Sequence, residues 1–327
     1  MSAIEKLLKT NATYATILRQ LKNRDACPHA MLIMGPDELA LKEFAKLIVL
    51  HIMCEGSKIA CSNCPGCIKV TNGTHADVLS YPKQDKSFLV EDALEVADTM
   101  HILPYEGGKK VYVLAFGSNA NAQSQNKLLK SIEEPARDVV FVLTATNEAG
   151  VLSTIKSRAI KFNIRAFSHN AILEYLQSEY AGRSNLELAA SYSGGSLTSA
   201  VNYATDATFA TKLGLVFDLL IKMTHSSNSL SFAARVQKQK GDFKNFVKLF
   251  NVVVGASLRA SDVVTNFASE HKSILNTFGN CGLAKLIKLG NEVNERATRN
   301  ANFNATIDYF ILKILEIRHD VNKNSNS

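Results

Sequence analysis

The chain has 327 residues, of which 46% are hydrophobic and 20% are charged, the balance of a globular protein with two or three domains. No apolar stretch approaches the roughly 20 residues that span a membrane, and the charged amphipathic N-terminus does not resemble a signal peptide, so we expect a cytoplasmic protein. The net charge of +7 is compatible with a polyanionic partner but does not identify one.

The first half of the chain alternates helices with buried strands. In chain order, the pattern predicts a helix over residues 1–22, a strand at 31–35, a helix at 41–53, a strand at 111–116, a helix at 121–134, and strands at 139–144 and 159–162. The first predicted strand ends in a Gly-Pro turn, as in the opening unit of a nucleotide-binding domain. This alternation is typical of an α/β fold with a parallel sheet covered on both faces.

After residue 167 the pattern becomes entirely helical. Three short helices are predicted at 171–180, 185–192 and 197–204, followed by long helices from 207 to 319 that are interrupted by GNCG at 279–282. The tail, residues 321–327, is too polar to pack and is expected to fray.

The most distinctive local motif is a cluster of four cysteines. Cys54, Cys61, Cys64 and Cys67 are separated by six, two and two residues. Two-residue gaps let neighbouring thiolates face one point, and four thiolates in a tetrahedron suit structural Zn²⁺. Because such a site has no open coordination position, we assign it no catalysis. An iron–sulfur cluster, visible by absorption near 400 nm, and free or redox-active thiols remain the alternatives.

A phosphate-binding loop reads G-x-x-x-x-G-K-[ST], and the turn after the first strand departs from this pattern. Gly35-Pro36 stands in the right place, but Ala40 replaces the last glycine, Leu41 the lysine and Lys42 the hydroxyl residue. We therefore expect a degenerate loop.

Two further features argue against nucleotide chemistry. Asp37 and Glu38 place carboxylates where phosphate would lie, and like charges repel. The strand at 111–116 runs into Gly117-Ser118 without the acid that holds Mg²⁺ in a Walker-B strand. The sequence thus predicts that this chain binds neither ATP nor Mg²⁺.

Five segments carry a resemblance to a known family: CPHAMLIMGP (27–36), the cysteine insert (54–67), HADV (75–78), NKLLKSIEEP (126–135) and TIKSRAIKF (154–162). Through them, the N-terminal two-thirds of the chain resembles the delta-prime subunits of the bacterial DNA polymerase III clamp loader, within the AAA+ clamp-loader family. NxLLKxxEEP followed by T-I-x-S-R is shared with the gamma/tau ATPases. The lost ATP motifs favour delta-prime, whose members commonly lack them.

The resemblance implies a division into three domains. These are an AAA+ P-loop-like α/β domain with a zinc insert at about 1–166, a small helical lid at 167–206 and an all-α collar at 207–320. The collar is expected to oligomerise with other subunits by burying apolar side chains such as Phe246, Val247, Leu249 and Phe250.

The resemblance also implies partners and a role. Delta-prime stands in a hetero-pentameric ring with gamma/tau and delta subunits, which opens the sliding clamp (beta) and places it on primer–template DNA. In that ring it does not hydrolyse ATP itself but presents an arginine to the γ-phosphate on a neighbour.

The family's Ser-Arg-Cys motif stands here as Ser157-Arg158-Ala159, which makes Arg158, with Ser157, the candidate arginine finger. A guanidinium offers a fixed cation and several donors to the phosphoryl oxygens. The alternative is that Arg158 belongs to a solvated basic strand end with Lys156 and Lys161. The change of Cys to Ala at 159 concerns packing more than charge.

Two other positions depart from the pattern of an ATPase or could be mistaken for catalytic residues. Related ATPases carry a sensor arginine near Thr198, and its absence fits a chain with no nucleotide to sense. Glu133-Glu134, just before Pro135, are expected to organise the subunit's own structure or an interface rather than to bind metal.

Two alternative functions remain open from the sequence. One is a divergent gamma/tau-type ATPase in which a one-residue slip lets Lys42 act as the lysine, leaving Glu43 in place of the magnesium-binding hydroxyl. The other is a nucleic-acid-binding zinc module, which would bind DNA tightly on its own and in a salt-sensitive manner.

Overall fold

The computed structural model describes residues 2–21, 27–56, 60–83, 87–106, 108–117, 120–258, 267–298 and 302–325. The chain divides into two compact units. The first comprises Met1–Ala181 with Gly195–Ala200, and the second comprises Gly182–Gly194 with Val201–Ser327. The division into three domains at residues 166 and 206 stays a prediction.

The first unit is built on a five-stranded parallel sheet with the strand order β2-β3-β4-β1-β5. The strands are β1 (Ala30–Met34), β2 (Val78–Tyr81), β3 (Lys110–Gly117), β4 (Val139–Ala145) and β5 (Ile160–Asn163). Every residue of β1 and β4 is buried, which explains why both read as continuous apolar runs. The predicted α/β fold class, a parallel sheet covered by helices and followed by an all-helical part, is confirmed.

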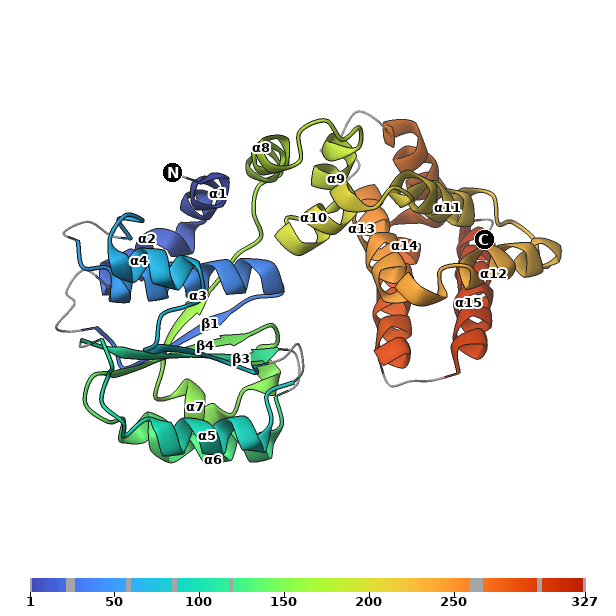
Figure 1. Cartoon of the computed structure of the whole chain (residues 1–327). Helices are drawn as coiled ribbons and strands as arrows, with labels where there is room; N and C mark the ends of the chain where they lie inside the picture. Colours follow the sequence, from blue (N-terminus) through green and yellow to red (C-terminus); the bar gives the residue numbers. More distant parts are fainter. Residues whose placement is uncertain are drawn as a thin grey trace. The chain divides into compact units, whose positions relative to one another are not determined.

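Helices cover both faces of this sheet (Figure 1). Helices α3 and α4 lie on one face, and α5 and α6 lie on the other. The helices of this unit are α1 (Ala3–Thr10), α2 (Ala12–Gln20), α3 (Glu38–Met53), α4 (Pro65–Thr71), α5 (Val90–Thr99), α6 (Ala122–Glu133), α7 (Ser153–Lys156) and α8 (His169–Glu179), with a 3₁₀ turn at Glu148–Gly150. Val96 of α5 and Ile132 of α6 pack with Tyr112 and Phe141 of the sheet in one buried core.

The single helix predicted over residues 1–22 is wrong. Asn11, only 5% exposed, ends α1 and caps α2 by accepting a hydrogen bond from the Thr13 N–H. Its side-chain amide also donates to the Arg165 carbonyl at 2.8 Å. The chain breaks here because Asn11 is needed at a distant strand end, which the local periodicity does not reveal.

Strand β2 and the turn before β3 depend on Asp77 of the HADV segment. Its carboxylate is 2% exposed and accepts hydrogen bonds from the backbone N–H groups of Tyr105 (2.6 Å) and Glu106 (2.8 Å). Strand β2 was not predicted, because it has only four residues and only one of the four, Tyr81, is buried. The hydrogen bonds to Asp77 thus help to hold this short strand in place, whereas longer strands of the sheet are held by the burial of their apolar side chains.

The second unit is helical throughout its described residues. Its elements are α9 (Leu186–Tyr192), α11 (Phe209–Ile221), α12 (Ser229–Gln237), α13 (Phe243–Leu258), α14 (Ala268–Thr298) and α15 (Phe303–Ser325), with 3₁₀ turns at Ser226–Asn228 and Lys240–Asp242; α10 (Leu197–Thr205) begins in the first unit and ends in the second. Gly279, at φ 58°, interrupts α14 where the sequence predicted a break. No helix among the described residues is both long enough and apolar enough to cross a bilayer.

The apolar residues that were expected to form a collar interface lie in the core of the second unit instead. Phe246, Val247, Leu249 and Phe250 of α13 are each at most 1% exposed within this single chain. The Phe250 ring packs edge-on against Phe310 of α15, with the centroids 4.9 Å apart. The prediction that these side chains become buried by oligomerisation is wrong, because the apolar face of α13 is already buried in the core of its own unit.

Candidate functional site

The turn between β1 and α3 is where a phosphate loop would stand. The Gly35 N–H donates to the Ala145 carbonyl at 3.2 Å, and a Cβ on Gly35 would come within 3.0 Å of the Ile164 carbonyl oxygen. The close approach of the chain after β5 therefore favours glycine here, which accounts for this residue without phosphate binding.

Asp37 caps α3 and joins it to a distant segment. The residue is 6% exposed, and its carboxylate accepts a hydrogen bond from the Ala40 N–H at 3.0 Å. The same carboxylate accepts the Thr198 hydroxyl at 2.6 Å and the Thr198 N–H at 3.2 Å. The Thr198 hydroxyl in turn accepts from the Leu39 N–H at 3.1 Å. The first amides of α3 are thus occupied by the chain's own side chains.

The remaining positions of the loop also lack the groups that bind a phosphate. Ala40 and Leu41 are buried at 0% and 2% exposure, so the position of the phosphate-binding lysine holds a core leucine. Lys42 is exposed on α3. The described strand β3, Lys110–Gly117, carries no carboxylate. The arrangement offers no cation at the lysine's place and no acid at the end of β3.

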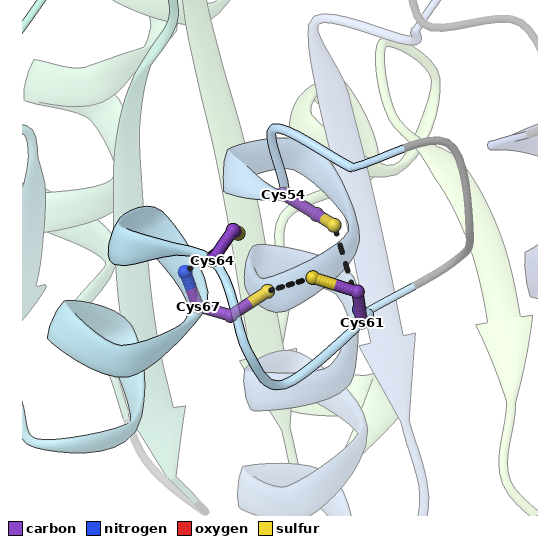
Figure 2. A group of neighbouring side chains, drawn as sticks. All are labelled: Cys54, Cys61, Cys64 and Cys67. Carbon is purple, nitrogen blue, oxygen red and sulfur yellow. Dashed lines mark hydrogen bonds between the residues drawn. The ribbon is translucent and has the colours of Figure 1, made fainter.

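At the other end of α3, the four cysteines converge (Figure 2). Cys54 follows the last turn of α3, and Cys64 caps α4. The four sulfur atoms lie within 4.8 Å of one another, and those of Cys61 and Cys67 are 4.0 Å apart. A tetrahedron with Zn–S bonds of about 2.3 Å has edges of about 3.8 Å, so the cluster fits a zinc ion.

Backbone N–H groups support the thiolate forms. The Cys61 N–H donates to Cys54 Sγ and the Cys67 N–H donates to Cys64 Sγ, both at 3.4 Å. Burial raises the pKa of these thiols, but at Cys64 the hydrogen bonds it accepts, led by that from Cys67, outweigh burial and lower the pKa to about 6. At Cys54 the bond from Cys61 also outweighs burial and lowers the pKa, whereas burial keeps the pKa of Cys67 raised. A coordinating metal deprotonates such thiols outright.

Gly66 holds the second half of the cluster against the first. A Cβ at this position would lie 2.3 Å from the Met53 carbonyl oxygen, and the Gly66 N–H donates to Glu55 Oε1 at 3.0 Å. Ser62 adopts φ 62°, a left-handed turn next to Cys61. None of the six cysteines, all of which are described, forms a disulfide. The turns between the ligands thus bring the sulfurs to one point.

Arg158 lies in the turn between α7 and β5, where it is exposed together with Ser157. Its guanidinium donates to the Thr154 carbonyl at 2.9 Å and to the Ser157 hydroxyl at 3.2 Å. It also forms a 2.6 Å ion pair with Glu133, the last residue of α6. The guanidinium is held in place by its own chain rather than extended into solvent.

Arg158 and the turn at Gly35 lie at opposite ends of the sheet. Strands β1 and β5 are parallel, with Met31 opposite Ile160 and Met34 opposite Asn163. Arg158 precedes β5, whereas Gly35 follows β1. Arg158 therefore cannot serve a nucleotide at the start of its own α3.

Comparison with known proteins adds a family to this geometry. Residues 10–168 match the family described as DNA polymerase III, delta subunit. The chain is 24% identical to DNA polymerase III subunit gamma of Buchnera aphidicola over 296 residues, which cover 87% of this chain and 81% of that protein. It is 31% identical to DNA polymerase III subunit delta' of Pseudomonas aeruginosa over 146 residues, 43% of this chain and 44% of that protein.

Over residues 10–168, the chain thus matches the DNA polymerase III clamp-loader family. A crystal structure of a DNA polymerase III gamma subunit-related protein from Thermotoga maritima aligns with 93% of this chain and 99% of its own, with a TM-score of 0.49 and 14% identity. The relatives carry the names gamma, tau and delta'.

Two contacts of this site were predicted only in part from the sequence. The acid at Asp37, just before an apolar helical run, is a recognisable N-cap signal, but its bond to Thr198 crosses 161 residues and has no local signature. The Glu133–Arg158 pair is partly foreseen, since Glu133-Glu134 were expected to organise the subunit's own structure.

Proposed function

We propose that this chain is a clamp-loader subunit of the delta-prime type: a subunit that does not hydrolyse ATP itself and that supplies Arg158 to a neighbouring ATPase subunit. In the assembled complex with gamma/tau and delta, it helps to open the sliding clamp and place it on primer–template DNA in the cytoplasm. A structural Zn²⁺ held by Cys54, Cys61, Cys64 and Cys67 stabilises the insert after α3.

The state of the turn before α3 carries this proposal. A bound triphosphate needs amides that are open to it, a lysine and a metal-binding acid. Here the Leu39 and Ala40 amides already have partners, and Leu41 is buried in the core. A nucleotide would have to expel the Asp37 carboxylate from its place, which supports a role without bound ATP.

The place of Arg158 supports an action in trans. It lies at the opposite end of the sheet from the chain's own loop, on the exposed turn before β5. Glu133 restrains the guanidinium through the ion pair at 2.6 Å, which reduces the side-chain entropy lost when a phosphate binds. We propose that Glu133 positions the arginine and that the neighbour's γ-phosphate replaces or joins it as the anionic partner.

The test is ATP hydrolysis by the reconstituted clamp loader with Arg158→Ala in this chain. An arginine finger contributes on the order of 10³-fold or more at the site that it serves, so single-turnover hydrolysis at one site of the complex should nearly stop. Lys161→Ala is the matched control, because Lys161 is an exposed cation of the same basic segment. An unchanged rate with Arg158→Ala, or equal losses in both variants, would refute the finger.

The second candidate function is a gamma/tau-type ATPase that binds ATP itself through Lys42. It is favoured by one observation: the match to the Buchnera gamma subunit extends over 87% of this chain, whereas the match to the Pseudomonas delta' subunit extends over 43%. Equilibrium binding of labelled ATP–Mg²⁺ to the full chain separates the two. Micromolar affinity that is lost in Lys42→Ala would replace the delta-prime assignment.

A further inference from the structure

The start of α3 presents backbone donors that are arranged for an anion. The first N–H groups of any helix have no partner within it, and the helix dipole adds partial positive charge, so a working phosphate loop uses them to bind phosphate. Helix α3 has 16 residues, and the amides of Leu39 and Ala40 stand in its first turn. In this chain the two amides bind Thr198 Oγ1 and Asp37 Oδ1 instead.

A second helix contributes donors to the same carboxylate. Thr198 is the second residue of α10, and both its N–H and its hydroxyl donate to Asp37. Asp37 therefore bridges the N-termini of two helices and binds a residue that is 161 positions away in the sequence. At 6% exposure, its negative charge is balanced by these donors and by the partial charges of two helix ends.

From this geometry we infer that Asp37 and Thr198 form an internal clasp that takes the structural place of a nucleotide phosphate. The carboxylate occupies the anion position at the start of α3 and fastens Gly195–Ala200 to that helix permanently. The neighbouring contacts agree: the Gly195 carbonyl accepts from the Phe167 N–H at 2.9 Å, and a Cβ on Gly195 would lie 2.7 Å from the Phe167 carbonyl oxygen. The segment that meets α3 is thus also packed closely against Phe167.

The clasp has a functional consequence. In a nucleotide-binding protein, contacts to phosphate come and go with the ligand, so the segments that make them respond to nucleotide. Here the anion is covalently part of the chain, and the contact persists in every nucleotide state of the complex. This inference concerns the chain's own conformation and does not depend on the role of Arg158.

Hydrogen exchange of the full chain, followed by mass spectrometry, tests the clasp. We expect slow exchange at the amides of Leu39, Ala40 and Thr198, unchanged by ATP–Mg²⁺ or pyrophosphate. Thr198→Val removes the hydroxyl and keeps the side-chain shape, and should speed exchange at Leu39 by about fivefold or more, as expected for the loss of one net hydrogen bond. Thr198→Ser is the matched control, because it keeps the hydroxyl and should keep the protection. Equal exchange in the three proteins would overturn the inference.

A second pair of variants separates the clasp from ordinary capping. Ser168 caps α8 by accepting from the Ala171 N–H at 3.3 Å, so Ser168→Ala removes a cap alone. We expect it to raise the unfolding equilibrium constant about fivefold. Asp37→Ala removes a cap together with the bonds to Thr198, and should raise the constant by on the order of 100-fold. Equal effects would mean that Asp37 is only a cap.

The outcomes also distinguish the clasp from the proposed function. If the wild-type chain bound ATP while the Leu39 and Thr198 amides stayed protected, the delta-prime assignment would fail, and so would the inference that the clasp takes the place of a phosphate. If ATP–Mg²⁺ released the protection at Thr198, the clasp would be overturned. If Arg158→Ala left hydrolysis by the complex unchanged, only the finger would be lost.

Discussion

Helix α3 has a different kind of polar site at each end, and the contrast distinguishes a site that is satisfied by its own chain from one whose ligand atoms face a common point. At its start, the Asp37 carboxylate accepts hydrogen bonds from the Ala40 N–H and the Thr198 hydroxyl of the same chain. At its end, four sulfurs face a common point, and the backbone donors that reach them leave that point to a cation. A site whose polar groups satisfy each other needs no ligand, whereas four cysteine sulfurs that face one point form a ligand set that a metal ion completes.

The largest effect is expected at the end of α3. Cys61→Ser removes one of four ligands and should lower zinc affinity more than roughly 100-fold, beyond what the loss of a supporting hydrogen bond costs a metal site. Zinc content after gel filtration, measured by plasma mass spectrometry, checks this. Cys281→Ser, at an exposed cysteine outside the cluster, should keep one ion per chain. Equal zinc content in the two variants would mean that the cluster is not the site.

At the start of α3, restoring the missing lysine should harm the fold instead of restoring nucleotide binding. Leu41 is 2% exposed, so Leu41→Lys buries a cation without a partner and should lower the free energy of unfolding by about 3–5 kcal/mol. The exposed neighbour Lys42→Ala should change it by less than about 0.5 kcal/mol. Denaturant unfolding measures both. ATP binding by a stable Leu41→Lys protein would show that the loop still has phosphate-binding geometry.

The two glycines that flank α3 give an intermediate pair of effects. A Cβ at Gly66 would lie 2.3 Å from the Met53 carbonyl oxygen, and a Cβ at Gly35 would lie 3.0 Å from the Ile164 carbonyl oxygen. Gly66→Ala should therefore cost about 3 kcal/mol of unfolding free energy and reduce zinc content, and Gly35→Ala about 1 kcal/mol without affecting zinc. The same unfolding and metal assays apply. The reverse ranking would contradict the packing described at both turns.

The smallest effect concerns the acidity of the metal-free cluster. With its pKa lowered to about 6, Cys64 is mostly thiolate at pH 7 and mostly thiol at pH 5, so its alkylation by iodoacetamide should slow about tenfold as the pH falls between these values. A cysteine with an ordinary pKa near 8.5 is mostly thiol at both values and should slow about 100-fold. Peptide mapping after chelation gives the rates, and added zinc should suppress the reaction. A 100-fold fall at Cys64 would show an ordinary thiol.

Much of the first unit was predictable because its signals are local. The runs that became β1, β3 and β4 are mostly apolar, and the helix predicted at 121–134 became α6 (Ala122–Glu133). The break at Asn11 and strand β2 were not predictable, because both depend on contacts with residues far along the chain: the Arg165 carbonyl, and the backbone after Leu103 that Asp77 holds. Apolar periodicity likewise placed Phe250 on a buried face without revealing that Phe310 of the same chain covers it.

By itself, the sequence determined the residue types available at each end of α3: four cysteines at metal-binding spacing, and a leucine where a phosphate loop needs a lysine. These residues are only a few positions apart, so the short segment between them limits which side chains can come together. Only the tertiary structure decided that Asp37 binds Thr198 and that Arg158 binds Glu133. Such pairs form when packing of the sheet and its helices closes long loops, and no property of the separate segments encodes the partner.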